Sequence, residues 1–358
     1  MRYRYFAAPL AVGAALLFAG GAQAHGLSRQ AVYTQTNSAA GNAVQVLARG
    51  DDGSLTPAGS YSTGGLGTSA GLGSQGAVAL SENGRVLLAV DAGSDDVASF
   101  RVVQGGLELV GRVPSRGDFP VSVAIHGHDA YVLNANGVAN VAVFRLSDKG
   151  VLTPRFGGRA PLSTLNAGAA QVAVAPSGRA LVVTEKQTSQ LETFPLRRGI
   201  PGDPVVTPSS GPTPFGFAFD RHGTAVVSEA SNSTASSYRV ASGGGLDLIS
   251  ASVPTLQGAA CWVAITPDGR FAYTGNAATG SITGFSIARD GALTRLVADG
   301  RSASSPRPND LAIADGYLYA INPIAGSVTA YRIAADGSLT ALPAVTGLPQ
   351  GLAGLAAA

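Results

Sequence analysis

Two glutamates occupy places in the sequence where acid–base chemistry is possible. Glu185 and Glu229 each follow an apolar, β-rich run, at residues 180–184 and 224–228. A carboxylate that is held in a pocket can activate water as a general base or contact a cation. Glutamate is a poor turn-capping residue, so turn capping does not account for these two side chains. We predict Glu185 and Glu229 as catalytic candidates, with two solvated carboxylates on a rim as the alternative.

Both glutamates belong to a repeating unit that is clearest at residues 263–295. An apolar strand at 263–265 is followed by a turn in which Gly269 adopts positive φ without steric cost. A second β-rich run, a polar loop and a third strand that contains Phe285 follow. A turn at residues 290–291 then leads into a fourth strand around Leu293. The unit therefore predicts one four-stranded antiparallel sheet.

The unit recurs with the period of propeller blades. Aromatic residues of the third strands mark the repeat at intervals of 44 to 50 residues: Phe100, Phe144, Phe194, Tyr238, Phe285 and Tyr331. Seven units predict an all-β fold, a seven-bladed β-propeller of four-stranded blades. The first unit lacks its opening strand, and residues 348–355 resemble that strand. We predict that this C-terminal strand completes the first blade beside residues 32–36, with a loose apolar tail as the alternative.

Antiparallel order brings the starts of the first strands and the ends of the second strands to one face, called here the upper face. Polar residues end the second strands: Asn37, Asp91, Asn134, Glu185, Glu229, Asn276 and Asn322. Asn and Asp at such places commonly cap the next turn. A ring around the mouth of a central funnel is the functional alternative. On that basis we predict Asp91, Asn134, Asn276 and Asn322 as substrate-binding candidates.

A second set of candidates precedes or opens the first strands. Its members are Gln75, Phe119, Gln171, Phe215, Trp262, Asn309 and Asp310. Of these, we predict Gln75, Gln171, Phe215, Trp262 and Asp310 as contacts of a substrate. Trp262 and Phe215 could form the wall of an apolar pocket, and packing between blades is the alternative.

No metal site and no cofactor are predicted. His126 and His128 share a turn on the opposite face without a carboxylate or thiol partner in view. Cys261 is expected to be a small buried residue rather than a nucleophile, because no histidine is placed to activate it. The glycine-rich segment 63–76 lacks the P-loop lysine and any GxGxxG spacing before a helix. We expect it to be a mobile loop on the upper face.

The N-terminus has the pattern of a secretory signal. Arg2 and Arg4 precede an apolar run at residues 6–19, and a small-x-small site follows at residues 22–24. We predict cleavage after Ala24, a secreted or periplasmic protein, and one propeller domain over residues 25–358. Cleavage lowers the number of Lys and Arg residues from 24 to 22, equal to the 22 Asp and Glu residues. This balance predicts no nucleic-acid partner. No later segment reads as a membrane anchor, and we expect a monomer.

The repeat resembles the lactonase family of seven-bladed propellers, which includes bacterial 6-phosphogluconolactonase and fungal carboxymuconate cycloisomerase. The Val-Ala-x-x-Pro-x-Gly-Arg pattern at 172–179 and 263–270 and the Asp-Gly-x-Leu-Thr turns at Asp290 and Asp336 carry the resemblance. It covers the whole mature chain. It implies lactone hydrolysis in a funnel that uses histidine, arginine and glutamate. Where such relatives have a histidine-containing approach to a first strand, this chain has Ala169, Ala170 and Gln171.

Two functions therefore remain open. The first is an exported hydrolase in which Glu185 or Glu229 activates water and amides such as Gln171 or Asn276 steady the oxyanion of a lactone. The second is a non-catalytic extracytoplasmic propeller that binds a small molecule, a glycan or a protein on its upper face. In the first case the ligand is a lactone or a sugar-like molecule. The fold alone does not choose between them.

Overall fold

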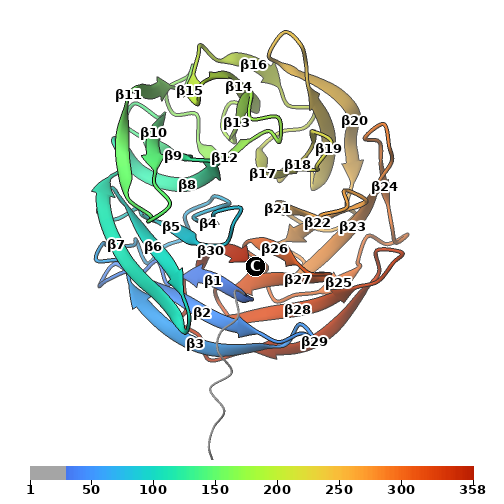
Figure 1. Ribbon diagram of the computed structural model, residues 1–358. Helices are drawn as coiled ribbons and strands as arrows, with labels where there is room; N and C mark the ends of the chain where they lie inside the picture. Colours follow the sequence, from blue (N-terminus) through green and yellow to red (C-terminus); the bar gives the residue numbers. More distant parts are fainter. Residues whose placement is uncertain (1–29) are drawn as a thin grey trace, which may run out of the picture.

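The computed structural model describes residues 30–358 and shows seven β-sheets arranged as blades around a ring (Figure 1). All regular elements within these residues are strands. The predicted all-β, seven-bladed propeller is therefore confirmed. The expected signal segment, residues 1–24, and the expected mature N-terminus, His25, lie outside the described residues. Within the described part of the chain, no helix is long and apolar enough to span a membrane.

The first three blades are built from the N-terminal part of the chain and the C-terminal strand. Blade 1 contains β30 (Ala353–Ala357), β1 (Ala31–Gln35), β2 (Ala43–Arg49) and β3 (Leu55–Ser62). Blade 2 contains β4 (Val78–Leu80), β5 (Val86–Asp91), β6 (Asp96–Val103) and β7 (Gly106–Pro114). Blade 3 contains β8 (Asp118–His126), β9 (Asp129–Asn136), β10 (Asn140–Leu146) and β11 (Leu152–Pro161).

The next two blades follow the same order, and the outer strand of blade 4 is interrupted. Blade 4 contains β12 (Ala169–Val174), β13 (Ala180–Glu185), β14 (Gln190–Arg197) and the outer pieces β15 (Ile200–Pro201) and β16 (Val205–Pro208). Blade 5 contains β17 (Pro214–Phe219), β18 (Thr224–Glu229), β19 (Thr234–Val240) and β20 (Leu246–Pro254).

The last two blades complete the ring, and the outer strand of blade 6 is also split. Blade 6 contains β21 (Ala260–Ile265), β22 (Phe271–Asn276), β23 (Ser281–Ile287) and the outer pieces β24 (Leu293–Arg295) and β25 (Ala303–Ser304). Blade 7 contains β26 (Leu311–Ala314), β27 (Tyr317–Asn322), β28 (Ser327–Ile333) and β29 (Leu339–Val345).

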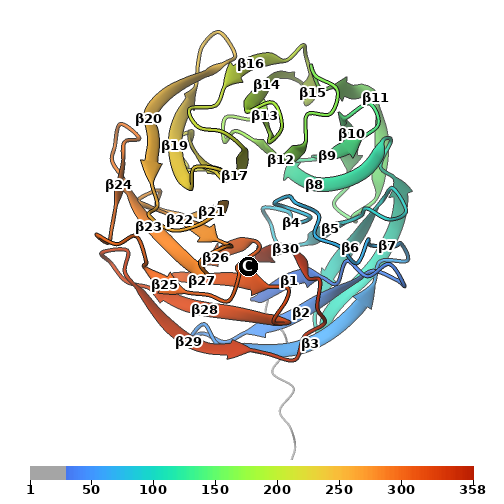
Figure 2. The same cartoon turned by 180° about the vertical axis from the view of Figure 1, so that it is seen from behind.

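The C-terminal strand closes the ring, as predicted. β30 pairs antiparallel with β1, with Val32 opposite Ala357 and Gln35 opposite Ala353. The view from behind shows β30, in red, beside β1, in blue (Figure 2). Arg49 Nε also donates to the carbonyl oxygen of Ala358 at 3.1 Å, which fixes the last residue of the chain.

The core lies between neighbouring blades. The third-strand aromatics identified in the sequence, Phe100 to Tyr331, are all at most 2% exposed. Phe144 packs with Leu88 of the preceding blade, and Phe285 packs with Val226 in the same way. Burial of such a ring stabilises the fold by about 2–3 kcal/mol. The repeat therefore encodes the contacts that join each blade to the one before it.

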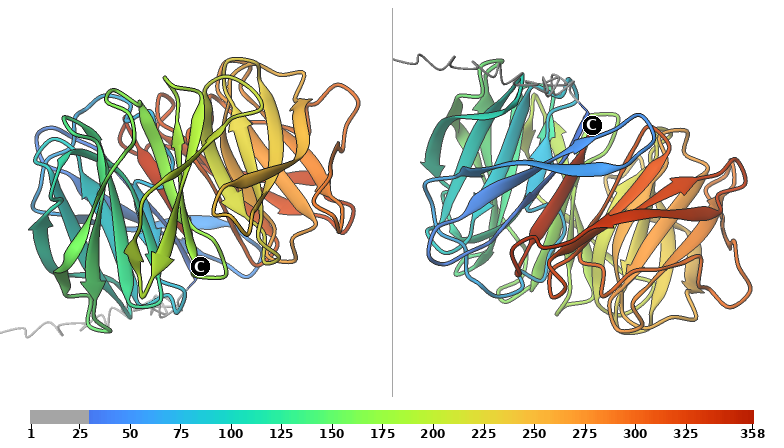
Figure 3. Two further views of the ribbon diagram at one scale, coloured as in Figure 1. Left: turned by 90° about the horizontal axis from the view of Figure 1, so that it is seen from above. Right: turned by 90° about the horizontal axis from the view of Figure 1, so that it is seen from below.

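The strands cross the thickness of the ring, as the side views show (Figure 3). Turns between first and second strands, such as the one from Thr266 to Phe271, lie on the lower face. The ends of the second strands and the starts of the first strands lie on the upper face. This geometry directs the search for a site to the loops above the first strands.

Candidate functional site on the upper face

The segment before β4 crosses the centre of the ring (Figure 1). Ser74 Oγ donates to the carbonyl of Val121 in blade 3 at 2.8 Å, and Ser74 O accepts from Trp262 Nε1 in blade 6 at 2.9 Å. The amide of Gln75 donates to Ala170 O in blade 4 at 3.2 Å. The amide of Gly76 donates to Asp310 Oδ2 in blade 7 at 3.1 Å. Because these bonds reach four blades, we call residues 74–76 the plug, since they lie across the upper end of the channel.

Gln75 is the centre of this plug. Its Oε1 accepts from the amide of Val263 at 2.9 Å, and its Nε2 donates to the carbonyl of Val263 at 2.7 Å. Blades 2 and 6 are not neighbours, so this side chain spans the channel. A Cβ atom at Gly216 would lie 2.1 Å from Gln75 Oε1, so the close approach requires glycine there. The predicted substrate contact of Gln75 is thus replaced by a bond to the protein backbone.

Gln171 and Asp310 are also bonded to the backbone. Gln171 accepts from the amide of Phe217 at 2.6 Å and donates to its carbonyl at 2.9 Å, which ties blade 4 to blade 5. Asp310 is 2% exposed and also accepts from the amide of Leu311 at 2.8 Å. Burial raises the pKa of Asp310 to about 7, against the lowering effect of backbone donors at Gly76, Leu311 and Leu355. Both side chains, predicted as substrate contacts, are therefore buried and bonded to the backbone.

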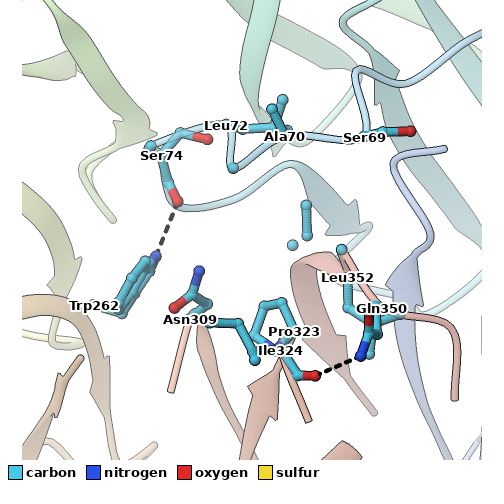
Figure 4. A pocket seen from close by; sticks show the side chains of 15 residues that line it. Ser69, Ala70, Leu72, Ser74, Trp262, Asn309, Pro323, Ile324, Gln350 and Leu352 are labelled. Atoms are coloured by element: carbon cyan, nitrogen blue, oxygen red, sulfur yellow. Dashed lines mark hydrogen bonds between the residues drawn. The ribbon is translucent and has the colours of Figure 1, made fainter. Parts of the chain in front are cut away.

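An open pocket of about 390 Å³ lies beside the plug on the upper face (Figure 4). Three segments from different parts of the chain line it: residues 69–74, the 323–324 turn of blade 7 and residues 350–354 before and within β30. Trp262 and Asn309 complete its wall. The closing C-terminal strand therefore contributes to the pocket as well as to stability.

The polar groups of this pocket are mainly amides and backbone. Asn309 is half-buried, and its side-chain amide makes no hydrogen bond to another described residue. Gln350 donates to the carbonyl of Ile324 at 3.0 Å, and Trp262 lies edge to face on Phe215 with ring centroids 5.3 Å apart. No Asp, Glu, Lys, Arg or His is among the residues that line the pocket. Such a site suits an uncharged ligand with hydroxyl or carbonyl groups.

Lys186 reinforces the wall of the pocket, and the sequence analysis missed it. Its Nζ donates to the carbonyl of Gly73, which lines the pocket, and lies 5.2 Å from the centroid of the Phe215 ring. Burial lowers the pKa of Lys186. Burial also raises the pKa of Cys261 to about 12, which keeps this thiol protonated, as expected for a small buried residue. Lys186 and Trp262 therefore hold adjacent residues of the glycine-rich segment, Gly73 and Ser74.

The polar residues that end the second strands do not line a funnel, in contrast to the expectation. Asp91, Asn134, Glu185, Glu229, Asn276 and Asn322 are all 0% exposed. Most of them bond the segment that arrives from the preceding blade. Asp91 Oδ1 accepts from Thr63 Oγ1 at 2.7 Å, Asn134 Nδ2 donates to Ser115 O at 3.2 Å, and Asn322 Oδ1 accepts from Ser305 Oγ at 2.8 Å. Burial raises the pKa of Asp91 to about 6.

Asn276 is linked to the segment that arrives from blade 5 indirectly, through Ser281. Its Nδ2 donates to Ser281 Oγ at 3.1 Å and to Thr283 Oγ1 at 2.9 Å. Ser281 in turn donates to Gln257 Oε1 at 2.9 Å, and Gln257 belongs to the segment from blade 5. The whole set is therefore a ring of buried anchors, which we call the anchor ring. Turn capping, the alternative derived from the sequence, is closer to this role than substrate binding is.

Glu229 is the most fully bonded member of the anchor ring. Its carboxylate accepts from the amide of Gly211 at 2.8 Å, from Ser236 Oγ at 2.6 Å and from Ser252 Oγ at 3.0 Å. Thr234 Oγ1 and Ser209 Oγ are further donors. A Cβ atom at Gly211 would lie 2.6 Å from Glu229 Oε2, so the close approach of this loop to the carboxylate requires glycine at position 211. These donors leave little room for an attacking water.

Glu185 has a second acid as its neighbour. Glu185 and Glu192 lie on the same face of blade 4, and both side chains are buried. Glu185 Oε2 accepts from Thr188 Oγ1 at 2.5 Å, and Glu192 Oε1 accepts from the amide of Ser163 at 2.7 Å. Burial and then the charge of Glu192 raise the pKa of Glu185 to about 7, although the bond from Thr188 lowers it. Glu185 Oε1 and Glu192 Oε2 have no hydrogen-bond partner among residues 30–358, and one proton shared between the two carboxyl groups would satisfy both.

The histidines of the described chain do not gather into a metal site. His126 lies 3.5 Å from Glu82, and His128 lies 3.6 Å from Asp148, both on the lower face. Within residues 30–358 no group of three or more His, Cys, Asp or Glu side chains could hold a metal ion. The glycine-rich segment, expected to be a mobile loop, is bonded along its length, for example by Asn37 Nδ2 to Ala70 O at 2.6 Å.

Solved structures with the same fold include lactonases by name. A periplasmic gluconolactonase, PpgL, of Pseudomonas aeruginosa is 17% identical, with a TM-score of 0.69 over 90% of this chain and 98% of that one. A candidate 6-phosphogluconolactonase from Bacteroides uniformis is 17% identical, with a TM-score of 0.74 over 92% of this chain and 99% of that one. At this identity the likeness shows the fold. No curated protein matches the sequence.

The family itself is established by sequence. A family model described as "Lactonase, 7-bladed beta-propeller" matches residues 38–157 and 245–353, which together make up more than half of the chain. The matched ranges include all of blades 2, 6 and 7, most of blade 3, β2 and β3 of blade 1 with the first residue of β30, and β20 of blade 5. They also hold every residue that lines the upper-face pocket except Gly354. The chain belongs to the lactonase family of seven-bladed β-propellers.

Proposed function

We propose that the protein is an exported lactonase-family propeller that binds a small, uncharged lactone or sugar-like ring in its upper-face pocket. The observation that carries the proposal is the pocket of about 390 Å³ between the plug and the closing strand, with the unbonded amide of Asn309 in its wall. Ligand pockets are usually concave, with a few placed polar groups in a largely apolar wall. Trp262 offers an apolar surface and Asn309 offers a donor and an acceptor.

The lining favours an unphosphorylated ring. A phosphate group is normally held by arginine, lysine or a set of backbone amides, and none of the residues that line this pocket is cationic. A sugar lactone presents hydroxyl groups and one carbonyl, which an amide and backbone groups can bond. We therefore expect glucono-1,5-lactone to bind more tightly than its 6-phosphorylated form, by about tenfold or more.

Binding is tested by ligand titration of the full mature chain. The probes are glucono-1,5-lactone, an aliphatic lactone and 6-phosphogluconolactone. Asn309→Ala should weaken binding of the sugar lactone about tenfold, because it removes a hydrogen-bonding amide. Asn232→Ala, the same change at an exposed position of the β18–β19 loop, is the matched control and should bind like the parent. Equal affinity in all three proteins would remove the pocket from the proposal.

Lactone hydrolysis is the second candidate function, and membership of the lactonase family favours it. Water activation by Glu185 or Glu229 was the mechanism expected from the sequence. The anchor-ring bonds of both carboxylates argue for a structural role, so a hydrolase would need its water placed by the amides and backbone of the pocket. Turnover above the spontaneous rate that disappears in Asn309→Ala would support hydrolysis at this pocket. Absence of turnover in the folded protein would leave binding as the function.

Export is proposed from residues 1–24 and cleavage after Ala24. A periplasmic gluconolactonase shares the fold, which is consistent with such a location for this chain. The test is expression of the full sequence in a Gram-negative host, followed by mass measurement of the periplasmic protein. A mature N-terminus at His25 is the expected result. An uncleaved protein that remains in the cytoplasm would contradict export.

A further inference from the structure

The lower-face turn of blade 5 differs from its equivalents in blades 2, 4 and 6. The corresponding turns of blades 2, 4 and 6 have Glu-Asn-Gly at 82–84, Pro-Ser-Gly at 176–178 and Pro-Asp-Gly at 267–269. Blade 5 has Arg221 and His222 before Gly223. In blades 2, 4 and 6 a single arginine follows the glycine, as Arg85, Arg179 and Arg270, whereas in blade 5 two basic side chains precede the glycine. Packing within the blade does not explain the presence of Arg221 and His222, because both side chains are exposed.

Hydrogen bonds within the turn set its shape. Asp220 is 4% exposed, and its Oδ1 accepts from the amides of His222 and Thr224, both at 2.8 Å. Gly223 has a φ of 86°, which glycine adopts without strain. Arg221 Nε donates to His222 Nε2 at 3.1 Å, so the two side chains are held together. The basic groups are thus presented in one preformed arrangement.

Two hollows meet at this turn. The first, of about 430 Å³, lies toward blade 4 and is lined by Arg221, His222, Arg239 and Ser177 among others, with no carboxylate in its lining. The second, of about 530 Å³, lies toward blade 6 and adds Arg270 and Arg289. Arg221 and His222 line both hollows.

The positive charges here are not compensated by carboxylates. In the described part of the chain, neither Arg221, Arg239 nor Arg289 has a carboxylate oxygen within 4 Å, whereas Arg49, Arg112 and Arg155 elsewhere do. Asp268, which lines the second hollow, is paired with Arg270 at 3.0 Å. Asp220 is used inside the turn, and Asp290 supplies only its carbonyl, to Arg239 at 3.2 Å. Asp247, opposite Arg239 across the β19–β20 pair, forms no ion pair with it.

We propose that this lower-face site, centred on Arg221 with Arg239 and His222, binds a tetrahedral oxyanion, phosphate or sulfate. The guanidinium group presents a planar fork of N–H donors that matches such oxygens in a bidentate way. The first hollow is large enough for the anion and for part of a molecule that carries it. The near-balance of 24 basic and 22 acidic residues in the chain argues against an extended polyanion such as nucleic acid. The site lies on the face opposite the proposed ring pocket and does not depend on that function.

The test is a titration of the full mature chain with inorganic phosphate and with sulfate, followed by NMR or calorimetry at constant ionic strength with chloride as the reference ion. Saturable binding that weakens about tenfold in Arg221→Gln and in Arg239→Gln is expected. Arg85→Gln is the matched control, because Arg85 is an exposed residue beside the equivalent turn of blade 2, and it should bind like the parent. Unfolding midpoints of all variants confirm that each remains folded.

A further arm identifies the source of the anion. Glucose 6-phosphate that binds more tightly than inorganic phosphate would assign a phosphate ester as the ligand, and weaker binding would assign the free ion. A response to phosphate and sulfate no greater than the response to chloride would overturn the site. The same holds for binding that persists unchanged in both arginine variants.

Discussion

Gln75 pairs with Val263 across the centre of the ring through two hydrogen bonds: its Oε1 accepts from the Val263 amide at 2.9 Å, and its Nε2 donates to the Val263 carbonyl at 2.7 Å. A residue of the blade 1–blade 2 connection is thereby bonded like a strand neighbour to blade 6. This pair closes the upper end of the channel and leaves the adjacent pocket as the accessible site. The candidate ligand site of the upper face is therefore the pocket beside the plug and not the channel itself.

Removal of the Gln75 side-chain amide should destabilise the fold. Gln75→Ala leaves the amide and carbonyl of Val263 without partners in a buried place, which costs about 2–4 kcal/mol. Urea unfolding of the variant measures this loss. Gln187→Ala is the control, because Gln187 is exposed beside Lys186 and should change stability by less than about 0.5 kcal/mol. A Gln75 variant as stable as the parent would show that the plug does not hold the ring together.

Glu229→Gln should destabilise the protein by about 2–4 kcal/mol, because the new amide replaces one acceptor oxygen by a donor among donors such as the Gly211 amide and Ser236 Oγ. Chemical unfolding gives the free energy, and ligand titration gives the affinity. Affinity for the lactone should stay within about twofold of the parent in the folded variant. A variant of unchanged stability that lost lactone turnover would instead restore Glu229 to the catalytic role predicted from the sequence.

Stability should fall as the pH rises toward about 7, and Glu185 beside Glu192 contributes to this fall together with Asp91 and Asp310, whose pKa values burial also raises. The folded pKa of Glu185 is raised from 4.5 to about 7, so the folded protein binds more protons than the unfolded chain between these values. The contribution of the pair is fully present below pH 4.5 and is lost as the pH rises through 7. Glu192→Gln removes the second charge and should reduce this dependence, with a gain on the order of 1 kcal/mol at pH 8, while the part due to burial of Glu185 remains. Unfolding free energies at pH 5 and pH 8 give the comparison.

Blade 5 provides an internal reference for that prediction. Ser236 occupies in blade 5 the place that Glu192 has in blade 4, and its hydroxyl donates to Glu229 at 2.6 Å. Glu192→Ser should therefore convert the acid pair of blade 4 into the arrangement of blade 5. The same slope of stability against pH in the parent and in both Glu192 variants would contradict a shared proton.

Loss of the closing strand should open the ring. A chain that ends after Leu352 lacks β30, the buried Leu355 and the Leu355 amide that bonds Asp310. We expect a loss of more than about 4 kcal/mol, or failure to fold, because a blade edge and one inter-blade cluster are exposed together. Removal of residue 358 alone is the milder control, because it keeps β30 and deletes only the acceptor of Arg49 and the amide that donates to Ala31 O. Thermal unfolding that is unchanged by the longer deletion would contradict closure by β30.

The fold was accessible from the sequence because each blade repeats the same local signals. Phe285 in the third strand and Gly269 in the turn recur as equivalents around the ring, so each unit could be identified without knowing the others. Closure by the C-terminal strand followed from the missing strand of the first unit. The period of the repeat was therefore enough to predict the number of blades and how the ring closes.

The candidate site was less accessible because it depends on contacts between distant segments. Asn276 and Glu229 are polar residues at the ends of strands, and local sequence does not show whether such a side chain faces solvent or an arriving loop. Their donors lie in connections between blades, such as Gly211, and only the packed ring brings them together. The role of Lys186 likewise depends on the plug, which no local pattern places across the channel. Trp262, predicted from the sequence as a possible wall of an apolar pocket, does line the upper-face pocket, but its role in binding stays a prediction.

The most direct test of the central claim is calorimetric titration of glucono-1,5-lactone, under conditions of slow spontaneous hydrolysis, into the parent, Asn309→Ala and Asn232→Ala. We predict one binding site, affinity about tenfold weaker in Asn309→Ala and unchanged affinity in Asn232→Ala. Line broadening or shifts of the Trp262 indole signal on addition of the lactone should accompany binding, because this ring forms one wall of the pocket. Binding that is equal in all three proteins, or no binding by the folded parent, would contradict a ring-binding pocket on the upper face.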